Sequence, residues 1–200
     1  DPHQPKGNAV TVGISQRLIG KISEGAGKSR YQELVYFKLS QAYDINEANR
    51  EGGAGSPPRR PFGAVTGELR VSWMQYVTAE SIATYDPNRL CLLTSYSLIS
   101  LNDTRGDGLN LEYTWTEGVQ DQINASLRVR LHPSLDVMYG KRYSRLESQS
   151  LETLYGAQYR HQCWTVDFLY SEKPGIAGQP AEKKFLVQLN LMGVTSVGKK

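Results

Sequence analysis

Apolar and polar side chains alternate with a period of two residues along much of this chain. In residues 164–171, Trp164, Val166 and Phe168 fall on one face. Thr165 and Asp167 fall on the other, because successive side chains of a β-strand point to opposite faces. The same alternation recurs in residues 69–73, 109–115, 123–131 and 185–191. Each of these segments therefore has one apolar face and one polar or ionic face.

The alternation, together with the turn residues between the segments, predicts about eleven strands. They fall at about residues 8–22, 33–45, 63–75, 77–85, 89–101, 108–116, 121–131, 135–144, 151–160, 163–171 and 184–192. Short turns such as His132–Pro133–Ser134 connect most of them, whereas residues 46–61 and 172–183 form long loops. Both long loops are expected to be mobile.

Strand length favours a membrane barrel over a soluble sheet. A strand tilted across a bilayer needs roughly 9–11 residues, whereas strands of globular proteins average roughly 5–6. Aromatic residues near the strand ends fit the interfacial girdles of such a barrel, and they are Trp73, Tyr76, Tyr85, Tyr143, Tyr159, Trp164 and Tyr170. The predicted fold is an all-β, antiparallel, up-and-down transmembrane β-barrel, present as a fragment of a larger barrel.

Composition narrows the function classes. Of the 200 residues 39% are hydrophobic, and the mean hydropathy is −0.47, so a helical membrane protein is excluded. The net charge of +3 is spread over the chain without forming a basic stripe, so nucleic-acid binding is unsupported. An exported protein is made with an amino-terminal signal peptide, and no such segment begins at Asp1. We therefore expect residues 1–200 to be the carboxy-terminal part of an outer-membrane barrel, with further strands outside them.

The polar face supplies the candidate lumen-lining residues. They are Glu68, Arg70, Glu112, Asn124, Arg128, Arg130 and Asp167. Glu112, Asp136 and Asp167 could be mistaken for catalytic acids, but we interpret them as a solvated wall partnered by Arg128 and Arg130. The three histidines lack metal-ligand spacing, and residues 25–29 only resemble the end of a phosphate loop. No enzyme activity, metal or cofactor is expected.

Two other protein classes fit parts of the pattern. A generic porin or an outer-membrane hydrolase would share the barrel, although a hydrolase also needs a nucleophile beside a histidine on the wall. A soluble carbohydrate-binding sandwich would need its second inward face to be apolar, and the ionic face argues against it.

Several segments resemble one family. They are Leu109-x-Leu-x-Tyr113, Tyr139 to Tyr143, Leu151-Glu-x-Leu-Tyr-Gly-Ala-Gln-Tyr159, Cys163-Trp164, Phe185-x-Val-x-Leu-x-Leu-x-Gly193 and Ser196 to Gly198. Together they are similar to the carboxy-terminal barrel of the lipopolysaccharide-assembly outer-membrane proteins. The resemblance is specific over about residues 105–198 and weaker upstream, at Gln16–Leu18 and Gln41–Asp44.

The resemblance implies a function in the outer membrane of a Gram-negative bacterium. In this family a periplasmic jellyroll domain and further barrel strands precede the region. Lipopolysaccharide arrives through the jellyroll from a periplasmic bridge protein, a lipoprotein plugs the lumen, and the substrate leaves through a lateral seam into the outer-membrane lipid. The last strand would form one side of this seam, through Phe185, Val187, Gln188, Leu189, Asn190 and Leu191.

The cysteines depart from the family pattern. Family members often carry two adjacent cysteines at the turn that here contains Gln162-Cys163, and these bridge to the amino-terminal domain. The resemblance thus allows one interdomain disulfide through Cys163, with a free buried thiol as the alternative. Cys91 is expected to be a small packed side chain. If Cys163 meets a periplasmic domain, residues 160–163 and 132–133 are periplasmic, and the loops 46–61 and 172–183 are extracellular.

Overall fold

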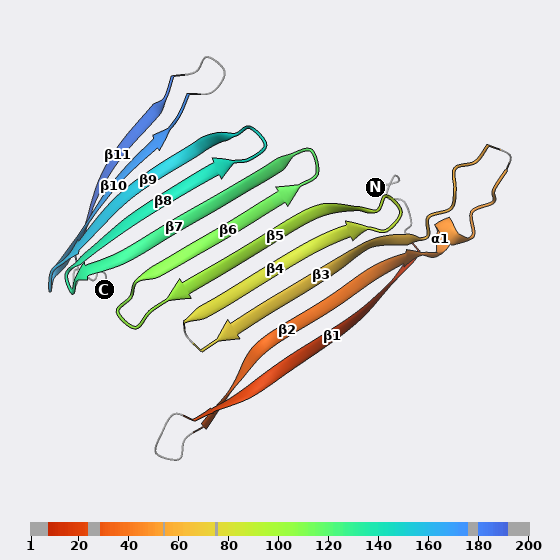
Figure 1. Cartoon of the computed structure of the whole chain (residues 1–200), viewed down its shortest axis with the longest axis horizontal. Coiled ribbons are helices and arrows are strands. Elements are labelled where there is room, and N and C mark those ends of the chain that lie inside the picture. Colours follow the sequence, from red (N-terminus) through yellow and green to blue (C-terminus); the bar gives the residue numbers. More distant parts are fainter. Residues whose placement is uncertain (1–7, 24–28, 54, 75, 176–179, 192–200) are drawn as a thin grey trace, which may run out of the picture. The chain divides into compact units, whose positions relative to one another are not determined.

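A computed structural model of the chain describes residues 8–23, 29–53, 55–74, 76–175 and 180–191. In these ranges nearly all regular structure is β-strand, and hydrogen-bonded neighbours follow one another in chain order from β1 to β11 (Figure 1). The elements are β1 (Ala9–Ser23), β2 (Ser29–Asp44), α1 (Ile45–Ala48), β3 (Phe62–Trp73), β4 (Val77–Asp86), β5 (Cys91–Asn102), β6 (Gly108–Thr116), β7 (Gln120–His132), β8 (Leu135–Ser144), β9 (Gln149–Arg160), β10 (Trp164–Lys173) and β11 (Glu182–Leu191). The predicted all-β, antiparallel, up-and-down fold is confirmed.

The largest boundary differences lie near the start of the chain. β2 begins at Ser29 instead of residue 33, so its connection to β1 shrinks to residues 24–28, which lie outside the described residues. Residues 25–28 of the phosphate-loop-like stretch 25–29 therefore also lie outside the described residues. A long connection here would have been unusual on the predicted periplasmic side, where short turns are the rule.

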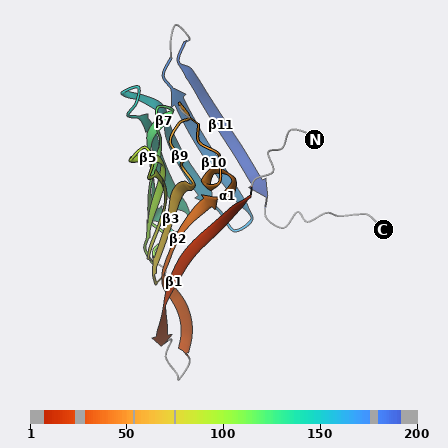
Figure 2. The same ribbon diagram turned by 90° about the vertical axis from the view of Figure 1, so that its right-hand side faces the viewer.

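The predicted 46–61 loop begins with a short helix that the alternation did not indicate. Asp44 caps α1 by accepting the backbone N–H of Glu47 at 3.0 Å, which satisfies one of the otherwise unpaired N–H groups of the first turn. The backbone N–H of Ile45 donates to the carbonyl of Asn8 at 2.8 Å. This bond places α1 beside the start of β1 (Figure 2). None of the described helices is long and apolar enough to cross a membrane.

The chain divides into two compact units. The first is built mainly on β1–β4 and the second on β7–β11, while β5 and β6 contribute residues to both. Within the first unit β1 pairs with β2 from Ala9 opposite Asp44 to Ser23 opposite Ser29, with a register shift at Leu18. Within the second unit, β7 to β11 pair antiparallel in succession.

One face of the second unit is apolar across all five strands. The pairing register aligns Val129, Val137, Ala157, Phe168 and Val187 in one row. Aromatic side chains flank this row on both sides along the strands. On one side the Tyr139 and Tyr155 ring centroids are 5.4 Å apart, and on the other those of Tyr159 and Trp164 are 5.5 Å apart. This order of aromatic, aliphatic and aromatic residues is typical of a lipid-facing belt.

The apolar face is exposed and the buried side chains are polar. Phe168 is 42% exposed and Phe185 69%. In the first unit Ile14 and Leu39, which lie opposite each other on β1 and β2, are 62% and 42% exposed. No described hydrophobic side chain is buried, whereas Asp136, Ser144 and Thr165 are. A soluble sandwich buries the apolar faces of its two sheets against each other, so this distribution argues against that alternative.

Asp136 is the most deeply buried of these side chains, with 0% exposure. The Arg160 guanidinium donates from Nη2 to both carboxylate oxygens, at 2.9 and 2.8 Å, and Arg130 Nε donates to Oδ1 at 3.2 Å. Three adjacent strands, β7, β8 and β9, supply the three groups. A buried carboxylate is costly unless it is paired, and the two arginines supply this pairing for Asp136.

The exposed apolar face predicts unequal tolerance to charge on the two faces of β7. Val129→Arg places a cation in the apolar row and should destabilise the membrane-inserted protein by about 2–4 kcal/mol. Ser126→Arg, on the opposite face beside Arg128, should be tolerated. The measurement is the free energy of unfolding of the full-length protein in lipid. Equal losses in both variants would contradict a lipid-facing role.

The buried carboxylate gives a second prediction. Asp136→Asn leaves two guanidinium groups without their anion and should cost about 2–3 kcal/mol of unfolding free energy. A suitable control is Glu117→Gln, which removes the ion pair with Arg89 at 2.7 Å. Because both side chains of that pair are exposed, its loss should cost less than about 1 kcal/mol. Urea titration in lipid measures both, and a loss at Asp136 no larger than the control would refute the pairing argument.

Candidate functional site

The polar face of β7–β11 carries a connected hydrogen-bond network. Asp167 accepts from the Gln158 amide at 2.6 Å and from the Asn190 amide at 3.0 Å, and Gln188 donates to Asn190 at 2.9 Å. Gln158 lies directly opposite Asp136 on β8, so this network adjoins the Asp136 cluster. The alternation of β8 to β11 produces it, because every second residue of each strand falls on this face. The result is a polar surface that crosses five strands near their 161–163 end.

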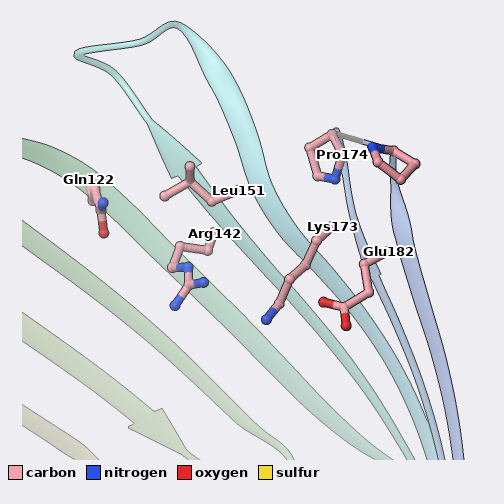
Figure 3. Close-up of a pocket in the computed structure, with 7 residues that line it drawn as sticks. Gln122, Arg142, Leu151, Lys173, Pro174 and Glu182 are labelled. Atoms are coloured by element: carbon pink, nitrogen blue, oxygen red, sulfur yellow. The ribbon is translucent and has the colours of Figure 1, made fainter. Parts of the chain in front are cut away.

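A second polar zone lies at the opposite end of the same strands. Figure 3 shows Arg142, Lys173 and Glu182 reaching into one pocket from β8, β10 and β11. The pocket has a volume of about 430 Å³ and is also lined by Gln122, Leu151, Pro174 and Pro180. Arg142 pairs with Glu152 at 3.3 Å, and Glu182 with Lys184 at 2.8 Å. The zone therefore holds charges of both signs, several of them already paired.

An apolar band separates the two polar zones. The register aligns Met138, Gly156, Leu169 and Leu186 on the polar face of β8 to β11. A Cβ atom at Gly156 would lie 3.1 Å from both Met138 Cε and Leu169 Cδ2, so glycine allows these side chains to meet over the strand. The polar face is thus interrupted by one apolar row.

The first unit has its own charged cluster, centred on Tyr36 of β2. The guanidinium carbons of Arg17 and Arg70 lie 5.4 and 5.3 Å from the Tyr36 ring centroid. Around them Arg17 pairs with Glu33 at 3.5 Å, Arg70 with Glu80 at 3.4 Å, and Lys38 with Glu68 at 3.1 Å. The strands β1 to β4 thus present a paired, exposed ionic surface next to an aromatic ring.

The candidate lumen residues fall into these clusters but not with the predicted partners. Glu68 and Arg70 belong to the Tyr36 cluster. Glu112 accepts from the Asn124 amide at 2.9 Å. The sequence predicts that Glu112, Asp136 and Asp167 pair with Arg128 and Arg130. Among the described residues, only the pair of Arg130 with Asp136 is present. Arg128 instead approaches Met138 Sδ at 3.5 Å. Asp136 is fully buried, so its description as part of a solvated wall is wrong.

Several residues of these clusters carry no recognisable signal in the sequence. Arg160 lies 24 positions from Asp136, and Gln158 was not singled out although it holds Asp167. Tyr36 was likewise missed. Only strand register brings these side chains together, and no local motif marks the pairs.

All residues of β11 are exposed. Phe185, Val187, Leu189 and Leu191 lie on its apolar face, opposite Tyr170, Phe168, Val166 and Trp164 of β10. Gln188 and Asn190 lie on its polar face. In the part of the chain that the structure describes, β10 is the only strand hydrogen-bonded to β11. Its other edge is therefore available to a further strand. Gly193 and the segment 196–198 lie outside the described residues.

Cys163 is exposed in the turn between β9 and β10. His161 stacks on Trp164 across this turn, with ring centroids 5.3 Å apart. The alternative of a buried Cys163 thiol is therefore wrong. Cys91 is half-buried, with its Sγ 3.9 Å from Glu117 Oε2. Among the residues that the structure covers, no group of three or more His, Cys, Asp or Glu could hold a metal ion.

Comparison with known proteins supplies the family. The LPS-assembly protein LptD of Nitrosospira multiformis is 25% identical over 196 residues, which are 96% of this chain and 20% of that protein. The chain thus spans about a fifth of the length of the curated relative it matches. The model of the family LptD, LPS transport system D, matches residues 3–139. This match and the resemblance drawn from residues 105–198 overlap in residues 105–139. Because more than half of the chain matches, the chain belongs to the LptD family.

Proposed function

We propose that this chain is part of an outer-membrane β-barrel that transports lipopolysaccharide into the outer leaflet of a Gram-negative cell. The observation that carries the proposal is the inverted distribution of side chains, with Asp136, Ser144 and Thr165 buried and the large apolar side chains exposed. That distribution fits a wall with lipid on one side and water on the other. Family membership and the relative's name, LPS-assembly protein, support the same substrate.

The two faces match the two halves of an amphipathic substrate. Sugars and phosphates offer hydrogen-bond donors, acceptors and charge, which the Asp167 network and the Arg142 pocket complement. Acyl chains require apolar surroundings, such as the row containing Phe168 and Val187. A wall of this kind acts by binding and guiding its substrate, and the role needs no bond-breaking step.

The histidine geometry gives no support to the hydrolase alternative. His132 Nδ1 accepts the backbone N–H of Ser134 at 3.2 Å, and His161 stacks on Trp164. Activation of a serine nucleophile needs a hydrogen bond from its hydroxyl to a histidine. No such bond occurs among the described residues. We therefore propose a non-enzymatic role.

The proposal assigns β11 to one side of the exit seam. Every residue of β11 is exposed, and its apolar and polar positions continue the two faces of β10. A strand from outside this chain would pair with the other edge. Such a pairing is not fixed by a hairpin turn, so it is the natural place for the barrel to open sideways. Gln188 and Asn190 would then face the sugars, and Val187 and Leu189 the acyl chains.

The partners follow from the same assignment. A plug lipoprotein would contact the polar face, and a periplasmic bridge protein would deliver substrate through a jellyroll domain outside residues 1–200.

A disulfide across the seam tests the exit route. A cysteine at a β11 position, paired with one in the first barrel strand of the full-length protein, should block export while the barrel still folds. Surface lipopolysaccharide is measured in cells before and after reduction, and recovery on reduction is the expected result. The matched control ties β10 to β11 through Phe168 and Val187, which are already register partners. Normal export with the seam crosslink quantitatively formed would place the exit elsewhere.

The exposed turn at Cys163 gives a separate test. We expect Cys163 to lie at the periplasmic end of the barrel and to pair with a cysteine of the amino-terminal domain in this oxidising compartment. Non-reducing electrophoresis of the full-length protein should show a mobility change that Cys163→Ser abolishes and Cys91→Ser retains. Labelling of Cys163 by a membrane-impermeant thiol reagent on intact cells would show that the orientation is reversed.

A further inference from the structure

The apolar face of β9–β11 contains a groove beside Ala157. It has a volume of about 240 Å³ and is lined by Tyr155, Gly156, Ala157, Phe168, Leu169, Tyr170 and Phe185. The small side chain of Ala157 lies opposite Phe168 in the pairing register, and Tyr155 lies opposite Tyr170. The groove is therefore a gap in a row of large side chains, with aromatic walls and an apolar floor.

Tyrosines mark one end of this groove. The Tyr155 ring is 5.4 Å from that of Tyr139 and 6.2 Å from that of Tyr170, so three rings follow one another across β8 to β10. Tyrosine rings prefer the boundary between hydrocarbon and headgroups, where the ring is apolar and the hydroxyl is wet. The groove thus begins at such a boundary and extends toward the apolar row.

Charged side chains follow directly beyond the tyrosines on the same face. The register aligns Lys141, Thr153, Glu172 and Lys183 in one row across β8 to β11. Lys183 is already paired with Glu172 at 3.4 Å. Lys141 is exposed and forms no ion pair or hydrogen bond with any residue that the structure describes. An unpaired cation on the outward face beside a row of tyrosines complements an anionic headgroup.

We propose that this face holds a phosphate-bearing lipid of the surrounding leaflet. One acyl chain lies in the Ala157 groove, the tyrosines contact the base of the headgroup, and Lys141 binds its phosphate. The site lies on the outer surface of the wall, so it is distinct from the polar face and from the free edge of β11. The inference rests on the proposed placement of the apolar face in a membrane.

The site is tested with full-length protein in nanodiscs of phosphatidylcholine that contain phosphatidylglycerol as the minor, anionic component. After mild extraction into detergent, native mass spectrometry measures the phosphatidylglycerol that remains bound. Lys141→Gln should weaken retention about fivefold, as expected for one lysine near a membrane surface. Ala157→Phe fills the groove and should reduce retention of phosphatidylglycerol and phosphatidylcholine alike.

Two matched variants serve as controls. Arg128→Gln removes an exposed cation from the opposite face, at a residue outside the Arg142 pocket, and should leave retention unchanged. Lys183→Gln removes a cation that is already paired with Glu172, so its effect should be smaller than that of Lys141→Gln. Heat-modifiable electrophoresis confirms that each variant is folded.

Several results would overturn the lipid site. They are equal losses in Lys141→Gln and Arg128→Gln, unchanged retention in Ala157→Phe, and displacement of the lipid by soluble glycerol phosphate, which would indicate a free-anion site. These results differ from failure of the proposed function. If the wild-type protein does not insert into nanodiscs, the membrane placement itself is wrong. If it inserts but shows no preference for phosphatidylglycerol, only the lipid site is lost.

Discussion

The antiparallel hydrogen-bond register is the constraint on which the rest of the structure depends. Side chains alternate with a period of two, so a slip of one residue would move every apolar side chain to the polar face. The register of β7 to β11 keeps Val129, Val137, Ala157, Phe168 and Val187 in a single row. In hydrocarbon the hydrogen bonds between strands are also needed to satisfy the backbone, because each unpaired N–H or C=O costs several kcal/mol there. Register therefore fixes both the faces and the backbone satisfaction of the sheet.

Ion pairs and hydrogen bonds between side chains stabilise the polar face. Its charges are mostly paired, and the deepest of them, Asp136, is held by arginines from the strands on either side. Such a cluster specifies which strands meet and in which register, since a slip would leave a buried carboxylate alone. The band formed by Met138, Leu169 and Leu186 divides this face into two polar zones. A polar substrate moving along the wall would leave one zone and cross apolar surface before it reaches the next.

The apolar face and the free edge of β11 have different proposed functions. β11 presents two exposed faces and an edge that pairs with no described strand, so it combines access to lipid, to the polar side and to a partner strand. One strand further in, the Ala157 groove lies on the lipid side alone. A lipid held there would sit next to the strand through which we propose that the substrate leaves. The two proposals can nevertheless fail independently, because the seam depends on the free edge of β11, whereas the lipid site depends on the Ala157 groove and Lys141.

The sequence by itself determined the class of fold and the identity of the two faces. Alternation is a local property of each strand, so the strands, their short turns and the apolar positions of β10 and β11 could be predicted from it. Family resemblance added the expected substrate. The short helix α1 was missed because its four residues are set by the Asp44 cap and not by a periodic pattern.

Only the tertiary structure decided which side chains meet. Arg160 reaches Asp136 across 24 residues, and Tyr36 lies between Arg17 and Arg70, because neighbouring strands are aligned by hydrogen bonds that no local motif encodes. The same reason explains why Asp136 is buried although its flanking residues resemble those of the half-buried Glu112 and Asp167. It also explains the apolar band, in which Gly156 makes room for side chains from strands on both sides. Periodicity assigns a residue to a face, but its partners and its burial depend on register, which is a property of pairs of strands.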